Sequence, residues 1–130
     1  MPRLLRDAPL NGIWEGSGNV IALDVLRALA REPDGLAAFR AECDLARGGN
    51  AVLDDHLDAL PVELSPWNAR RAVEELALAF QAALLVRYAP PFVSDAFCAA
   101  RLADGGRVFG TLPSGVDGEA IVTRALRDDS

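Results

Sequence analysis

Apolar residues recur along this chain at helical spacing, and glycine and proline divide the pattern into separate segments. No alternation of apolar and polar residues lasts long enough to indicate a strand. The expected helices run from a cap at Ser17 or Asn19 to about Arg31, and then over about 35–46, 50–60, 65–88, 92–103 and 118–127. The pattern therefore predicts an all-α fold, a helical bundle.

The first residues differ from the rest of the pattern. Met1–Asp7 is short, basic and apolar, and could be the last turn of an incoming helix. Ala8–Gly16 contains one proline and two glycines, so we expect it to be irregular. We therefore divide the chain into residues 1–19, a loop segment, and residues 20–130, the helical bundle.

The longest expected helix follows Ser65-Pro66, where a capping hydroxyl precedes a proline suited to the first helical position. Its second half, Leu76–Val86, is apolar nearly all round. A helix of this kind is normally buried, so we expect it at the centre of the bundle. Four aromatic residues at helical positions are expected in the core rather than on a base-stacking surface: Trp67, Phe80, Phe92 and Phe97.

Composition narrows the class of protein. The net charge of −6 argues against general attraction to nucleic acid, because nucleic-acid binders usually carry a basic stripe. The run Leu76–Val86 is too short to cross a bilayer, and the start shows no secretory leader. Cys43 and Cys98 form no paired motif and are expected to be buried thiols. We expect a cytoplasmic protein without a membrane partner.

The only histidine, His56, lies among acidic residues at Asp54, Asp55 and Asp58. Carboxylates and an imidazole at helical spacing can bind a metal ion. A solvated acidic turn is the commoner origin of such a pattern, and we expect no metal site here.

The best candidate for a catalytic or binding segment is Pro9–Asn19, which has the sequence Pro-Leu-Asn-Gly-Ile-Trp-Glu-Gly-Ser-Gly-Asn. It places the carboxylate of Glu15 beside an aromatic ring, and apolar surroundings raise a carboxyl pKa toward the range of a general base. The segment Gly16–Gly18 would let backbone N–H groups approach an anion such as a pyrophosphate. From spacing alone, an exposed glutamate next to a helix cap is the commoner origin of such a pattern.

The amino-acid sequence of this stretch resembles the glutamate segment of the acyl-CoA dehydrogenase family. Ile13–Asn19, followed by Leu23–Arg27, is similar in particular to the DNA-alkylation-response (AidB-like) branch of that family. The likeness continues through Tyr88–Pro91 and Asp95–Cys98, and so covers most of the chain.

The resemblance implies a role for each residue of the motif. Glu15 would remove a proton from the α-carbon of an acyl-CoA-type thioester while the flavin takes a hydride from the β-carbon. The residues expected along FAD are Trp14, Gly16, Ser17, Gly18 and Asn19. Arg27 projects from the following helix and could face DNA, although an exposed helix arginine is the simpler alternative.

Members of that family also contain an N-terminal helical domain and a middle β domain, so this chain would correspond to the C-terminal helical domain alone. We therefore expect it to hold no FAD and to be inactive by itself. Two other functions stay open: a DNA-binding or protective module, and a structural oligomerisation bundle. Apolar faces at Val20–Leu29 and Leu76–Val86 lead us to expect a homo-oligomer, most simply a dimer.

Overall fold

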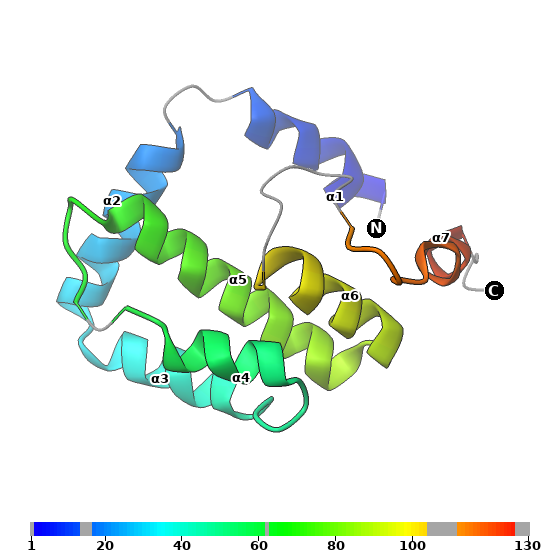
Figure 1. Cartoon of the computed structure of the whole chain (residues 1–130). Coiled ribbons are helices and arrows are strands. Elements are labelled where there is room, and N and C mark those ends of the chain that lie inside the picture. Colours follow the sequence, from blue (N-terminus) through cyan, green and yellow to red (C-terminus); the bar gives the residue numbers. More distant parts are fainter. Residues whose placement is uncertain (1, 14–16, 62, 104–111, 127–130) are drawn as a thin grey trace.

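A computed structural model describes residues 2–13, 17–61, 63–103 and 112–126 (Figure 1). These residues form helices and connecting turns, with no strand among them. The elements are α1 (Pro2–Asp7), the 3-10 helix η1 (Ala8–Gly12), α2 (Ser17–Arg31), α3 (Asp34–Asp44), α4 (Ala51–Asp58), α5 (Ala69–Tyr88), α6 (Pro91–Arg101) and α7 (Gly118–Leu126). The predicted all-α helical bundle is confirmed.

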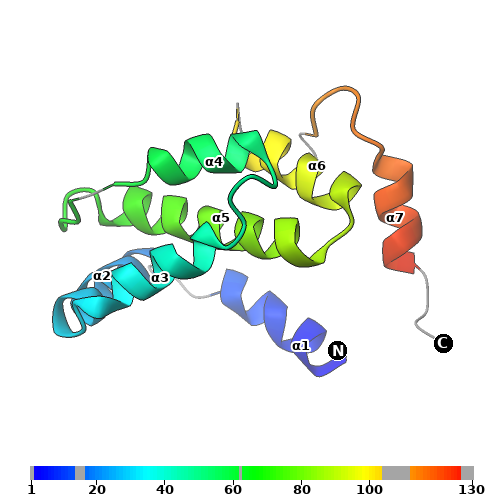
Figure 2. The same cartoon turned by 90° about the horizontal axis from the view of Figure 1, so that it is seen from below.

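Helix α5 lies at the centre of the bundle. It packs against α2, α3, α4 and α6. Figure 2 shows α4 and α6 on one side of α5, with α2 and α3 on the other. The central position predicted for this helix from its apolar second half is confirmed. No helix among the described residues is both long enough and apolar enough to span a bilayer.

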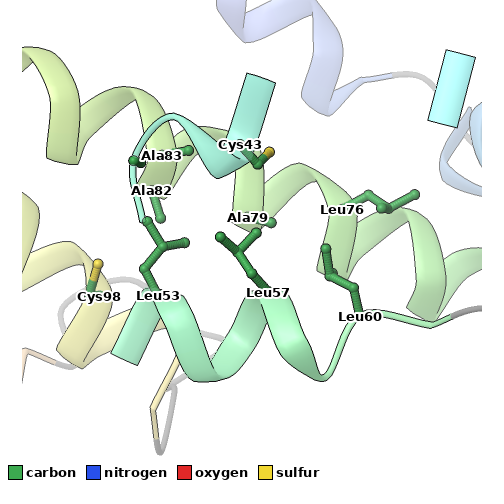
Figure 3. Packing of buried hydrophobic residues seen from close by; sticks show 10 residues of the cluster. Cys43, Leu53, Leu57, Leu60, Leu76, Ala79, Ala82, Ala83 and Cys98 are labelled. Atoms are coloured by element: carbon green, nitrogen blue, oxygen red, sulfur yellow. The ribbon is translucent and has the colours of Figure 1, made fainter. Parts of the chain in front are cut away.

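The core is built largely from small side chains. Alanines on α5 face α4 and α6 across a cluster that contains four buried leucines (Figure 3). The cluster consists of Cys43, Ala46, Leu53, Leu57, Leu60, Leu76, Ala79, Ala82, Ala83 and Cys98. Because alanine adds almost no width to a helix, the neighbouring backbones can lie close to α5.

Both cysteines lie in this core as free thiols, as expected from the sequence. Burial raises the pKa of Cys98 to about 11, with a smaller contribution from the charge of Asp95. Burial also raises the pKa of Cys43, and the neighbouring carboxylates Asp44 and Glu42 add to this effect. Both groups are therefore protonated and unreactive near neutral pH.

The turn between α3 and α4 is fixed by specific residues and lies against α5. Gly48 takes a φ of 80°, a left-handed conformation that ends the preceding helical stretch. Asn50 then caps α4, since its Oδ1 accepts hydrogen bonds from the backbone N–H groups of Val52 and Leu53 at 3.1 and 3.2 Å. Between them, Gly49 lies so close to Val86 of α5 that an added Cβ would be 2.4 Å from its Cγ1.

The start of α5 differs from the prediction. Ser65 does not cap this helix, which begins at Ala69. The side chain of Asn68 instead organises a turn before it: Oδ1 accepts a hydrogen bond from Ser65 N at 2.8 Å, and Nδ2 donates to Glu63 O at 3.0 Å. These local side-chain bonds compete with helix formation and delay it.

The placement predicted for the aromatic residues is wrong for Trp67. Trp67 is 98% exposed, because it lies in the turn before α5 and not on the helix. Phe80 and Phe92 are 38% and 37% exposed, so they lie at the edge of the core. Phe97 packs against the core cluster as predicted.

The N-terminal elements stand apart from the bundle. Ala8–Gly12 forms the 3-10 helix η1, where irregular chain was expected. Among the described elements, η1 is the one against which α1 packs extensively. Leu4 and Leu5 of α1 are 69% and 76% exposed. The division of the chain at residue 19 stays a prediction.

Candidate functional site

The second half of the glutamate motif forms the first turn of α2. Ser17, Gly18 and Asn19 open this helix, so their backbone N–H groups lie at its positively polarised end. Trp14, Glu15 and Gly16 lie outside the described residues. The catalytic role of Glu15 and the flavin contacts of its neighbours therefore stay predictions.

An arginine that the sequence analysis did not single out lies beside this turn. A Cβ atom placed on Gly18 would be 3.5 Å from Nη2 of Arg70, in the first turn of α5. The guanidinium adds a full positive charge next to the partial positive charge of the α2 N-terminus. Arg70 is 52 positions from Gly18 in the sequence, and only the packing of α5 across α2 brings the two together.

Arg27 is exposed on α2 and forms an ion pair with Asp24, three residues earlier on the same helix. The contact of Arg27 with DNA stays a prediction. Arg27 also stands at the edge of an apolar groove of about 630 Å³ between α2, α3 and residues 64–66.

His56 does not lie in a solvated acidic turn, and that expectation is wrong. Its side chain is 10% exposed and points at α5, where Nε2 lies 3.1 Å from the backbone oxygen of Glu75 and 3.6 Å from its Oε2. The ring borders a pocket of about 350 Å³ between α4 and α5. His56 follows Leu53 at helical spacing, which places it on the face of α4 that meets α5.

The carboxylates near His56 have other partners. Asp54 accepts hydrogen bonds from the backbone N–H of Gly48 at 3.1 and 3.2 Å, and Asp58 forms an ion pair with Arg47 at 2.9 Å. Within the part of the chain that the structure describes, no three His, Cys, Asp or Glu side chains are grouped to hold a metal ion.

The fold and the motif together define an all-α bundle whose second helix begins inside a glutamate-glycine segment. No protein-family model matches the chain, and no solved structure matches it. Two curated proteins match it in part. AidB of Escherichia coli (strain K12), which carries the name of an acyl-CoA dehydrogenase, is 33% identical over 112 residues, covering 83% of this chain and 20% of that protein.

The second relative is acyl-CoA dehydrogenase family member 11 of Caenorhabditis elegans. It is 40% identical over 57 residues, which cover 44% of this chain and 9% of that protein. The chain thus spans a fifth or less of the length of the curated relatives it matches. Both matches confirm the predicted resemblance to the acyl-CoA dehydrogenase family, and they are consistent with this chain being a part of such a protein.

Proposed function

We propose that this chain is part of a flavin-dependent acyl-CoA dehydrogenase-like protein in which Glu15 is the catalytic base. The observation that carries the proposal is the Trp-Glu-Gly-Ser-Gly-Asn motif leading into α2, in a chain that matches two proteins named as acyl-CoA dehydrogenases. The matched share of those relatives is small, so the activity belongs to a longer protein.

The proposed chemistry assigns one task to Glu15. An α-proton of an acyl thioester is acidic enough for a carboxylate to remove when the carbonyl oxygen is polarised, provided that the base is held in place. A bound FAD would accept the hydride that leaves the β-carbon. The two bonds broken are then Cα–H and Cβ–H, and the product is the α,β-unsaturated thioester.

The described residues fit a bound anion such as the FAD pyrophosphate. The first turn of α2 presents backbone N–H groups at Ser17–Asn19, and Gly18 has no side chain to block access to them. Arg70 lies against Gly18 and supplies positive charge at the same place. We propose that these groups, with Trp14 and Gly16, form one wall of the flavin site, and that other parts of the longer protein supply the remaining walls.

The test uses a full-length protein that contains this segment. Glu15→Gln keeps the shape of the side chain and removes its basic oxygen, so we expect FAD to stay bound and acyl-CoA-dependent dye reduction to fall about 10²–10⁴-fold. Glu119→Gln, an exposed glutamate in the first turn of α7, is the matched control and should leave the rate unchanged. Full activity of Glu15→Gln would end the assignment.

The same proposal predicts the behaviour of the 130-residue chain by itself. Because one wall cannot enclose a flavin, the purified chain should be colourless, and titration should leave the absorbance and fluorescence of FAD unchanged. A yellow protein with one FAD per chain would show that these residues suffice for the cofactor site.

A further inference from the structure

The pocket between α4 and α5 is formed within the bundle, by residues 56–61 and 68–75, and the proposed flavin chemistry does not use it. Its volume of about 350 Å³ is near the lower end of the range for pockets that bind small molecules. Its apolar part includes Leu60 and Ala72, which are 5% and 2% exposed. The other lining residues are Ala59, Pro61, His56, Asn68, Arg71 and Glu75.

The imidazole of His56 presents an unpaired nitrogen to this pocket. Its side chain is 10% exposed, and Nε2 lies 3.1 Å from the backbone oxygen of Glu75. We assign the proton to Nε2, because a carbonyl oxygen accepts hydrogen bonds and cannot donate them. Nδ1 of the neutral ring then carries a lone pair, and no described residue donates a hydrogen bond to it. Since no polar side-chain atom of the described residues is both fully buried and unpaired, Nδ1 is accessible from the pocket.

The carboxylate of Glu75 also receives no hydrogen bond from a described residue. Its side chain is 24% exposed. Oε2 lies 3.6 Å from Nε2 of His56 and Oε1 lies 3.9 Å from Nε of Arg71, and both distances are too long for a hydrogen bond. Two acceptors, Nδ1 and the carboxylate, therefore line one small pocket without a donor between them. A primary ammonium group complements both, since it carries three N–H donors and a positive charge.

Arg71 determines what else such a ligand must carry. Its side chain is 82% exposed at the edge of the pocket, four residues before Glu75 on the same helix. The guanidinium would repel a ligand that carries only a positive charge, whereas a carboxylate on the same ligand would bind its planar set of donors. The pocket thus pairs one positive with one negative side chain, and a ligand with the same two charges matches it.

We propose that this pocket binds a small α-amino acid with an aliphatic side chain. The ammonium group binds the carboxylate of Glu75 and Nδ1 of His56, and the carboxylate of the ligand binds Arg71. The aliphatic side chain packs on Leu60 and the neighbouring apolar lining. The proposal does not rest on the catalytic role of the glutamate motif.

Binding can be followed at the pocket itself, because His56 is the only histidine of the sequence. Titration of L-valine into the ¹⁵N-labelled 130-residue chain at constant pH should shift the ring signals of His56 until they saturate. We expect a dissociation constant of about 1 mM or below. The Nδ1 signal should move most, since this atom gains a hydrogen bond. Isobutylamine lacks the carboxylate of valine and isovalerate lacks its ammonium group, so each should bind at least about tenfold more weakly.

Two substitutions test the charged groups separately. Glu75→Gln and Arg71→Gln should each raise the dissociation constant for valine at least about tenfold, because each removes one of the two charges. The matched controls, Glu119→Gln and Arg31→Gln, change exposed residues on other helices and should leave the affinity unchanged. Because Arg71 is a surface side chain, its substitution tests the pocket even where Glu75→Gln lowers stability. Circular dichroism of each variant shows whether the helices are retained.

Three results would overturn the proposal. One is the absence of any saturable shift of the His56 signals when valine is added. Another is equal affinity for valine and isobutylamine, which would remove the role of Arg71. The last is an unchanged affinity in a folded Glu75→Gln variant, which would place the binding of valine outside this pocket.

Discussion

Leu53 is the largest fully buried side chain of the core, and its truncation measures how α4 is attached to α5. The residue is 0% exposed and faces Ala82 and Ala83 of α5, with Cys98 of α6 beside it (Figure 3). These neighbours have short side chains that cannot move far into a vacated space. Leu53→Ala should therefore leave a cavity that the structure does not refill.

The size of the effect follows from this environment. Truncation of a buried leucine to alanine costs about 2–5 kcal/mol, and sites that collapse poorly lie in the upper part of that range. We therefore expect Leu53→Ala to lower the free energy of unfolding by about 3–5 kcal/mol. For a chain of this length, that loss corresponds to a fall in Tm of about 11–18 °C.

Urea unfolding followed by circular dichroism provides the assay, at one fixed chain concentration because association changes apparent stability. The matched control is Leu45→Ala, since Leu45 is 62% exposed and should cost less than about 0.5 kcal/mol. The dependence of the free energy on urea should be unchanged in both variants. A cost below about 1 kcal/mol for Leu53→Ala would refute the packing of α4 on α5 described here.

Two other predictions follow from the core. Gly49→Ala places a Cβ 2.4 Å from Cγ1 of Val86, so thermal melts should show a loss of about 1–3 kcal/mol, whereas Gly118→Ala, with open space around it, should cost nothing. The raised pKa of Cys98, about 11 against an ordinary 9.0, means that the folded chain keeps a proton that the unfolded chain loses above pH 9. The free energy of unfolding should then fall as the pH rises from 9 to 11, and Cys98→Ala should flatten this dependence in urea melts. The raised pKa of Cys43 acts in the same direction, so part of the fall should remain in Cys98→Ala and disappear when Cys43 is also replaced by alanine; an equally steep fall in Cys98→Ala would contradict the assignment.

Much of the fold could be predicted from the sequence because glycine and proline mark its boundaries. Gly48-Gly49 and Asn50 locate the end of one helical stretch and the start of α4, and the apolar run of α5 identifies the central helix. These features depend on local backbone conformation and on the identity of single residues. The local sequence was therefore sufficient to predict them.

The errors arose where side-chain contacts, either local or between helices, decide the outcome. Trp67 has helical spacing in the sequence, yet the hydrogen bonds of Asn68 start α5 after it and leave the ring in solvent. His56 lies among acids in the sequence, yet its ring turns toward Glu75 on another helix. Arg70 gave no signal at all, because its position beside Gly18 results from the crossing of α2 and α5.

The arrangement around α5 also sets the order in which parts of the chain open. Backbone amides of α5, enclosed by four helices, should exchange hydrogen with solvent only through global unfolding. Amides of α1 and α7 should exchange through small local fluctuations, since among the described elements each of these helices packs extensively on one other element. A partner bound at the N-terminal end can therefore slow exchange in α1 selectively, without any change in the core. Its presence would be detected as protection confined to the first residues of the chain.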